Sequence, residues 1–168
     1  MSKTANLRIR PAMPADVPLV LAFIRGLAEY EQLAHKVQAT EELLSEHLFG
    51  PRPCAEVVLA ELGGEAVGFA LFIHIYYSFL GRPGLYLEDL FVLPEARGRG
   101  VGRRLLAHLA RLAVERGCGR LDWTVLDWNE PAIGFYRRLG AWPLDEWTRY
   151  RLDGADLERL ADEAGTER

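Results

Sequence analysis

The sequence predicts a mixed α/β fold built around one central sheet. Apolar residues alternate in some segments, which predicts strands, and recur every three to four positions in others, which predicts helices. Glycine or proline residues separate many of these segments. The chain has 168 residues, of which 49% are hydrophobic, and this size and content suit one compact domain with a continuous core. We therefore expect a single domain over residues 1–168.

The N-terminal third predicts a strand followed by two helices. Residues 7–12, LRIRPA, read as a short strand. The apolar spacing over residues 16–30 is that of a helix with one buried face. Thr40 stands where it can cap a second, short helix, which Gly50 and the prolines after it end.

A hairpin and a further strand are expected next. AEVVLAEL (55–62) and EAVGFALFIHIYY (65–77) flank the pair Gly63-Gly64, and glycines accept the positive φ angles of a tight turn. Residues 78–84 break the pattern, and LYLEDLFV (85–92) resumes it as another strand.

The C-terminal part alternates helices and strands. Helical periodicity runs from Gly100 to about Gly117, and LDWTVLD (121–127) is expected to be a strand. Asn129 can cap another helix that ends near Gly140. EWTRYRL (146–152) is expected to close the sheet as its last strand.

Charge and composition exclude several classes of function. The formal net charge is −4 and the sequence pI is near 5.6, which argues against binding the phosphate backbone of nucleic acids and favours small cationic partners. The start, MSKTANLRIRP, lacks the apolar region of a signal peptide, and no apolar run approaches the roughly 20 residues that cross a bilayer. We expect a cytoplasmic protein that does not bind membranes.

No metal site or disulfide is expected. Cys54 and Cys118 lie far apart with no CxxC spacing, so both read as reduced thiols. The four histidines are scattered over different predicted elements and show no ligand spacing.

The most informative segment lies between a predicted strand and a predicted helix, and reads Arg97-Gly98-Arg99-Gly100-Val101-Gly102. Glycines let an anion approach the backbone closely, and the first turn of a helix offers unpaired N–H groups with a partial charge of about +0.5. This combination predicts a pyrophosphate site. Arg97, Arg99, Arg103 and Arg104 add cations that suit further phosphate oxygens.

Spacing separates this turn from other phosphate-binding loops. The pattern GxGxG lacks the GxGxxG dinucleotide fingerprint and the GK[ST] ending of a P-loop. A glycine-rich connection with a solvated arginine cluster remains the alternative on residues alone.

Arg97-x-x-Gly100-x-Gly102 resembles the [Q/R]xxGx[G/A] signature of the GNAT acetyltransferases, and the order of elements over residues 7–152 is similar to theirs. Three further segments resemble the diamine acetyltransferases, which include the spermidine/spermine and thialysine enzymes: Leu27–Glu31, Tyr86–Asp89 and Asp127–Pro131. The resemblance implies a mostly antiparallel mixed sheet, flanked by helices and splayed between two strands. It also implies an N-acetyltransferase that moves the acetyl group of acetyl-CoA directly to a primary amine of a small cationic substrate, and it implies a homodimer.

The resemblance also implies a set of cofactor-binding residues. The strand residues before the turn would pair with the pantetheine arm in a slot that opens toward residues 123–126, the turn amides would hold the pyrophosphate, and the start of the next helix would border the cofactor. These residues are Leu90, Phe91 and Val92, then Gly98, Arg99, Gly100, Val101, Gly102 and Arg103 with Arg97 beside them, and then Asn129, Pro131, Ala132 and Tyr136.

Two residues take catalytic roles by the same resemblance. Tyr136 would donate a proton to the departing thiolate, since a phenol has a reference pKa near 10. Its alternative is a ring that packs in the core with Phe135 and Leu139. Glu88 would accept the proton of the amine, directly or through water; its alternative is an edge carboxylate paired with an arginine.

A substrate-selecting cluster is expected from Tyr30, Glu31, Glu88 and Asp89, because carboxylates stabilise a cation and an aromatic wall adds cation–π attraction. Without the resemblance, Glu31 reads as part of a solvated helix end. By resemblance only, the substrate also contacts Asp122, Trp123 and Thr124.

Departures from the family pattern limit the choice of substrate. Tyr77-Ser78-Phe79 stands where polyamine-acetylating members carry an aspartate and a tryptophan, and Leu139 replaces a basic residue that some relatives place beside the cofactor. Thialysine or a lysine-like amine therefore ranks level with short diamines. A non-catalytic acyl-CoA sensor and a peptide or protein amine acetyltransferase remain alternatives.

Overall fold

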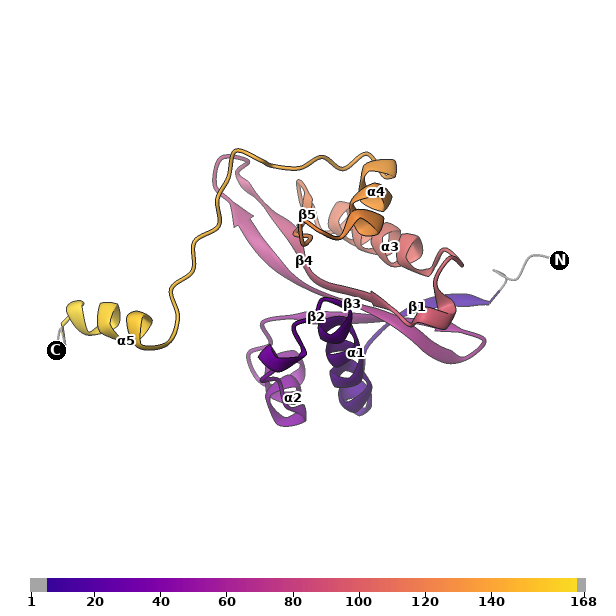
Figure 1. Ribbon diagram of the computed structural model, residues 1–168, viewed down its shortest axis with the longest axis horizontal. Coiled ribbons are helices and arrows are strands. Elements are labelled where there is room, and N and C mark those ends of the chain that lie inside the picture. Colours follow the sequence, from indigo (N-terminus) through magenta and orange to yellow (C-terminus); the bar gives the residue numbers. More distant parts are fainter. Residues whose placement is uncertain (1–5, 166–168) are drawn as a thin grey trace. The chain divides into compact units, whose positions relative to one another are not determined.

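The computed structural model describes residues 6–165 (Figure 1). Residues 1–5, which begin the segment MSKTANLRIRP, and residues 166–168 lie outside the described part. The chain forms two compact units, one ending at Leu126 and one beginning at Asp127. The single domain over residues 1–168 stays a prediction.

The first unit contains a five-stranded sheet in the order β1-β2-β3-β4-β5. Neighbouring strands are antiparallel except for β4 and β5, which are parallel. This confirms the mixed, mostly antiparallel sheet. The strands are β1 (Leu7–Pro11), β2 (Glu56–Leu62), β3 (Glu65–Tyr77), β4 (Arg82–Val92) and β5 (Leu121–Trp123).

Helices cover both faces of this sheet. Helices α1 (Val17–Tyr30) and α2 (Glu41–Phe49) lie on one face and α3 (Val101–Glu115) lies on the other (Figure 1). The predicted cap of α2 is confirmed, since the Thr40 hydroxyl oxygen accepts a 3.2 Å hydrogen bond from the Leu43 amide.

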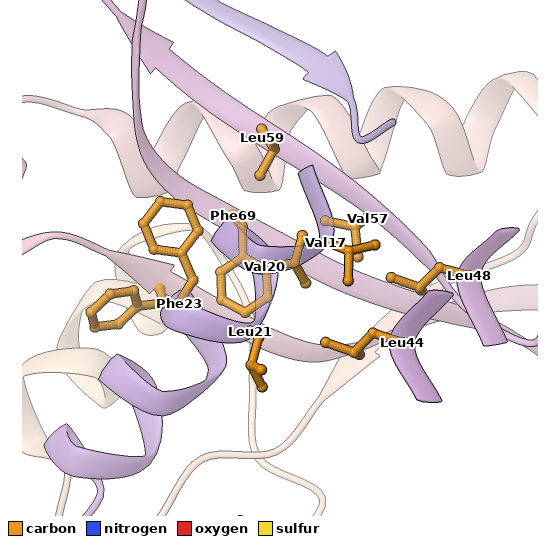
Figure 2. Close-up of a cluster of buried hydrophobic side chains, with 10 residues drawn as sticks. Val17, Val20, Leu21, Phe23, Leu44, Leu48, Val57, Leu59 and Phe69 are labelled. Atoms are coloured by element: carbon orange, nitrogen blue, oxygen red, sulfur yellow. The ribbon is translucent and has the colours of Figure 1, made fainter. Parts of the chain in front are cut away.

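The core between the sheet and the first two helices is aliphatic and aromatic. Figure 2 shows side chains from α1 and α2 meeting those of β2 and β3. The Phe23 ring stacks on Phe69 at 5.6 Å between centroids, and Phe91 of β4 joins the same cluster at 6.1 Å from Phe23. The fully buried Phe69 thereby anchors the middle of the sheet to α1.

Strand β4 contains a bulge that the sequence did not predict. Leu71 of β3 pairs with Asp89, but its neighbour Phe72 pairs with Leu87, so Glu88 is an extra residue in the ladder. A bulge changes the alternation of side chains at that point. The carboxylates of Glu88 and Asp89 can therefore approach the same side of the sheet although they are consecutive in sequence.

The pairing of β4 with β5 is short. It joins Leu85–Leu87 to Leu121–Trp123, while β4 continues to Val92. The expected strand over residues 121–127 is therefore too long. Only its first part finds a partner, and beyond it the backbone of Glu88–Val92 has no ladder with β5, as expected for a sheet that parts between these two strands.

The second unit contains α4 (Glu130–Arg138) and α5 (Gly154–Glu163). The predicted cap of α4 is confirmed: the Asn129 side-chain oxygen accepts a 3.4 Å hydrogen bond from the Ala132 amide. The expected strand over residues 146–152 is wrong, because that segment forms no ladder and most of its side chains, including Trp147 and Tyr150, are exposed. Helix α5 was not predicted, although Leu157 and Leu160 have helical spacing.

Within residues 6–165, no helix combines the length and apolar character needed to cross a membrane. No group of three or more His, Cys, Asp or Glu side chains in this range is arranged to hold a metal ion.

Candidate active site

The glycine turn before α3 has the backbone conformation expected of an anion site. Gly98 and Gly100 have φ angles of 69° and 79°, in the left-handed region that favours glycine, and both are exposed. The Arg104 amide donates to the Gly100 carbonyl oxygen over 3.0 Å, which begins the hydrogen-bond ladder of α3. The amides of residues 101–103 precede that ladder, so the donor set suits a diphosphate.

The Arg97 side chain lies beside the aromatic rings of Tyr30 and Phe91. Its Nε donates to the Val92 carbonyl oxygen over 2.9 Å, and its guanidinium lies 5.0 Å from the Tyr30 ring centroid and 5.7 Å from that of Phe91. Tyr30, Phe91 and Arg97 border a cavity of about 540 Å³ with otherwise mainly apolar walls. In this structure Arg97 is thus held by cation–π contacts, while Arg99 and Arg103 are exposed around the turn.

Three of the predicted substrate-binding carboxylates influence one another. Burial, then the charge of Glu88 and then that of Glu31, raise the pKa of Asp89 to about 7. Burial and the charge of Glu88 also raise the pKa of Glu31. These shifts mean that the structure brings Glu31, Glu88 and Asp89 together, and that their negative charges oppose one another when no cation is bound.

The end of α1 places Glu31 at this cluster, whereas the ring of the preceding Tyr30 lies beside the Arg97 guanidinium. Gln32 has a φ angle of 61°, which ends the helix, and the Leu33 amide donates back to the Ala28 carbonyl oxygen over 2.8 Å. This is the hydrogen-bond pattern of a Schellman cap. Glu31 therefore sits in the last ordered turn of α1 and is not on a freely solvated helix end.

The predicted substrate residues of β5 divide between the two faces of the sheet. The Tyr77 hydroxyl donates to Asp122 Oδ2 over 2.8 Å, and the Tyr86 hydroxyl donates to Thr124 Oγ1 over 3.4 Å. Asp122 and Thr124 thus share the face of Tyr86. Trp123 lies between them in a strand and faces the opposite side.

Tyr136 lies on α4 in the second unit. Its ring is half-buried and lies 5.4 Å from the Phe135 ring, at an interplanar angle of 49°. Asn129 is buried at the start of the same helix, Pro131 is exposed and Ala132 is half-buried. The contact with Phe135 agrees with the packing alternative and does not test a catalytic role.

Sequence reasoning missed two residues near the start of β5. The sequence indicates Tyr77 only as a departure from the family pattern, and it gives no indication of Arg120. Nothing local marks either residue, because the contact between them joins segments 43 positions apart. The Arg120 guanidinium lies 4.5 Å from the Tyr77 ring centroid.

Comparison with known proteins gives the family. The acetyltransferase (GNAT) family matches residues 23–141, which is more than half of the chain. The chain belongs to this family. A thialysine N-epsilon-acetyltransferase from Mus musculus is 37% identical over 94% of this chain and 98% of its own length. An L-ornithine N5-acetyltransferase from Arabidopsis thaliana is 33% identical over 91% of this chain and 87% of its own.

Solved structures show the same fold. An integron cassette protein from the mobile metagenome of V. cholerae superposes with a TM-score of 0.76 at 32% identity, covering 96% of this chain and 98% of that one. An aminoglycoside acetyltransferase in complex with sisomicin, from a soil metagenomic sample, has a TM-score of 0.73 at 19% identity over 88% of this chain and 97% of that one. At that identity the likeness concerns the fold alone.

The protein is therefore an acetyltransferase enzyme of the GNAT type, and the predicted resemblance and fold class are confirmed. Acetyl-CoA is the cosubstrate of this family, and the donors around the glycine turn suit its diphosphate.

Proposed function

We propose that this enzyme acetylates the primary amine of a small cationic substrate, either a lysine-like amino acid such as thialysine or a short diamine. The observation that carries this proposal is the carboxylate cluster of Glu31, Glu88 and Asp89, in which the pKa values of Glu31 and Asp89 are raised. An ammonium group placed there relieves the repulsion between the carboxylates, and the carboxylates in turn stabilise its positive charge. The thialysine and ornithine enzymes among the relatives support an amine of this kind.

The chemistry we propose is a direct attack of the amine on the thioester. An alkylamine with a pKa near 10.4 is almost fully protonated at pH 7, so a base must remove a proton before attack. Glu88 is our choice, because the bulge brings it beside Asp89 while its side chain stays exposed and open to water. Tyr136 is proposed as the acid that protonates the departing thiolate, on the strength of the family resemblance.

The proposed cofactor contacts follow the parted edge of β4 and the glycine turn. Main-chain groups of Leu90–Val92 would bind the pantetheine arm, and amides of residues 98–103 would bind the diphosphate. From the resemblance alone, we propose that Asn129, Pro131 and Ala132 border the cofactor. For Arg97, the Nε–H is engaged with the Val92 carbonyl oxygen, so the donors left for a phosphate are those of the two Nη atoms.

Release of free thiol from acetyl-CoA, measured across an amine panel, tests the proposal. The panel contains thialysine, lysine, ornithine, diamines, polyamines and a peptide with a lysine. We expect turnover with the small amines, and Glu31→Gln should raise the KM of dicationic amines about 10-fold or more while changing that of a monoamine less. Binding of acetyl-CoA without turnover of any amine would instead support the sensor alternative, and preference for the peptide would support the protein-acetylating one.

We also propose a homodimer and a cytoplasmic location. Support for the dimer comes from the family resemblance and from the exposed aromatic side chains of Trp142, Trp147 and Tyr150, which are 77%, 73% and 91% accessible. The location remains a prediction from the sequence.

A further inference from the structure

Asp122 at the start of β5 is held in a fixed orientation by a residue from another strand. Tyr77, the last residue of β3, donates its hydroxyl to Asp122 Oδ2 over 2.8 Å. Burial and this hydrogen bond raise the pKa of the Tyr77 hydroxyl, so the tyrosine stays a donor at neutral pH. One carboxylate oxygen of Asp122 is thereby engaged, and the other remains available to a ligand.

A cation lies over the ring of the tyrosine that holds this carboxylate. The Arg120 guanidinium lies 4.5 Å from the centroid of the Tyr77 ring, while the Arg120 carbonyl oxygen accepts a 3.0 Å hydrogen bond from the Leu85 amide. Arg120 makes no ion pair with any residue in the 6–165 range. Its guanidinium is exposed and retains its N–H groups for an anion.

Gly84 allows the Tyr77 ring to lie in this place. A Cβ atom at Gly84 would stand 2.4 Å from a carbon of that ring and 3.0 Å from the Arg120 carbonyl oxygen. The ring therefore packs directly on the backbone of β4, and Tyr77 contacts both Arg120, which precedes β5, and Asp122 of β5.

This group of Tyr77, Arg120 and Asp122 faces the same side of the sheet as the carboxylate cluster. Asp122 pairs with Tyr86, so the two side chains share a face. Tyr86 and Asp89 pair with Ile73 and Leu71, which are two residues apart in β3, so Asp89 lies on that face too, and the bulged Glu88 precedes it. From strand geometry, two residues along one strand and one step to the next put the Cα atoms of Asp122 and Glu88 about 8 Å apart. A separation of this order suits an amino acid whose side-chain amine reaches Glu88 while its α-amino group stays near Asp122.

We propose that Arg120 and Asp122 bind the α-carboxylate and the α-ammonium of an ω-amino acid, so that the enzyme prefers lysine-like amino acids to simple diamines. This inference rests on the proposed function and specifies its substrate. Tyr77 is a positioning residue that acts through Asp122. The preference arises because a diamine has a second ammonium for Asp122 but no carboxylate for Arg120.

The test compares substrates that differ only in the carboxylate. Thialysine is paired with bis(2-aminoethyl) sulfide and lysine with cadaverine, and kcat/KM is measured by thiol release at saturating acetyl-CoA. The wild-type enzyme should prefer the amino acid of each pair. Arg120→Gln should lower kcat/KM for the amino acid by about 10- to 100-fold and change that of the diamine by less than about threefold.

Two further variants separate the roles of the group. Asp122→Asn should lower kcat/KM for both members of each pair, because both substrates carry a second ammonium group. Tyr77→Phe should raise KM for both with little change in kcat, since it frees Asp122 without removing it. Arg111→Gln, on the exposed face of α3, removes a remote positive charge and is the matched control. It should leave the ratio of kcat/KM for the amino acid to kcat/KM for the diamine unchanged in each pair. Circular dichroism and the KM for acetyl-CoA verify that each variant is folded and binds the cosubstrate.

Two outcomes overturn the inference. One is a wild-type enzyme that turns over both members of a pair equally or prefers the diamine. The other is an Arg120→Gln variant that lowers kcat/KM for both members by the same factor. If no amine releases thiol, the proposed function itself has failed, and that result is distinct from either of these.

Discussion

Asp89 illustrates how one buried carboxyl connects folding with the proposed function. It lies beside the bulge in β4, where burial and the charges of Glu88 and Glu31 raise its pKa from 3.8 to about 7. A carboxyl with such a pKa is partly protonated at neutral pH. A bound ammonium group would favour its ionised form, so binding of a cation and loss of this proton are coupled.

Replacing Asp89 with Asn should remove a pH dependence of stability. The folded protein holds the Asp89 proton more tightly than the unfolded chain does, so ionisation opposes folding and stability falls as pH rises from about 4 to about 7. Urea unfolding at about pH 5 and pH 8 measures this. From pH 5 to pH 8, the free energy of unfolding of Asp89→Asn should rise by on the order of 1–3 kcal/mol relative to that of the wild type. If the two proteins differ by the same amount at both pH values, the pKa of Asp89 is not shifted in the folded protein.

The role of Tyr136 is a second question at the scale of one residue. Tyr136→Phe keeps the ring that contacts Phe135 and removes the only proton that the side chain can donate. We expect kcat to fall about 10- to 1,000-fold with the Kd of acetyl-CoA nearly unchanged. Unaltered turnover would remove Tyr136 from the mechanism and leave it as a packing residue.

Strand β4 is the element that organises the site in the first unit. Its start pairs with β5, its bulge presents Glu88 and Asp89, and its end leads into the glycine turn before α3. The antiparallel ladder with β3 holds all of these parts in register. A change in that ladder should therefore affect stability and cosubstrate binding together.

Alanine substitutions at two glycines should change the free energy of unfolding in opposite directions, because the added Cβ meets backbone too closely in one case and makes only an ordinary contact in the other. In β3, a Cβ at Gly68 would stand 2.7 Å from the Phe91 carbonyl oxygen, which is backbone and cannot move aside easily. Gly68→Ala should lower the free energy of unfolding by about 1–3 kcal/mol and raise the Kd of acetyl-CoA. Within α4, a Cβ at Gly134 meets its nearest atom at 3.5 Å, so Gly134→Ala should raise stability by about 0.5–1 kcal/mol. Thermal unfolding of both variants measures the signs, and a neutral Gly68→Ala would contradict the close approach of β3 and β4.

The molecule as a whole divides into two units, and the second contains a run of exposed, large apolar side chains. Trp142, Leu144, Trp147 and Tyr150 follow α4 with accessibilities between 49% and 91%, and α5 adds Leu157 and Leu160. Large apolar side chains gathered in one segment commonly mark a contact with another chain. This is the structural support for the proposed homodimer.

Light scattering coupled to size-exclusion chromatography checks the assembly. The wild-type protein should have about twice the 18.9 kDa chain mass. The double variant Trp147→Ser with Tyr150→Ser should shift the population toward the monomer, because it removes apolar area from the contact. A control with Val114→Ser, exposed on α3, should stay dimeric. A monomeric wild-type protein would refute the dimer.

Much of the fold could be predicted from local sequence signals. The helices begin and end where caps, prolines and glycines indicate: Thr40 caps α2, Asn129 caps α4, and Gly100 precedes α3. Each of these signals acts within a few residues of the chain, so periodicity and spacing suffice to find it. The glycine turn was identified in the same way, whereas the carboxylates of Glu31, Glu88 and Asp89 were singled out by the family resemblance.

The sequence by itself determined most of the elements, the family and the carboxylates of the candidate site, because short segments of the chain mark each of them. Only the tertiary structure decided the rest. The bulge at Glu88 depends on the register between β3 and β4, and the hydrogen bond from Tyr77 to Asp122 joins residues 45 positions apart. The strand expected over residues 146–152 failed for the same physical reason: a segment with strand propensity becomes a strand only when a neighbouring edge supplies its hydrogen bonds, and no local pattern carries that information.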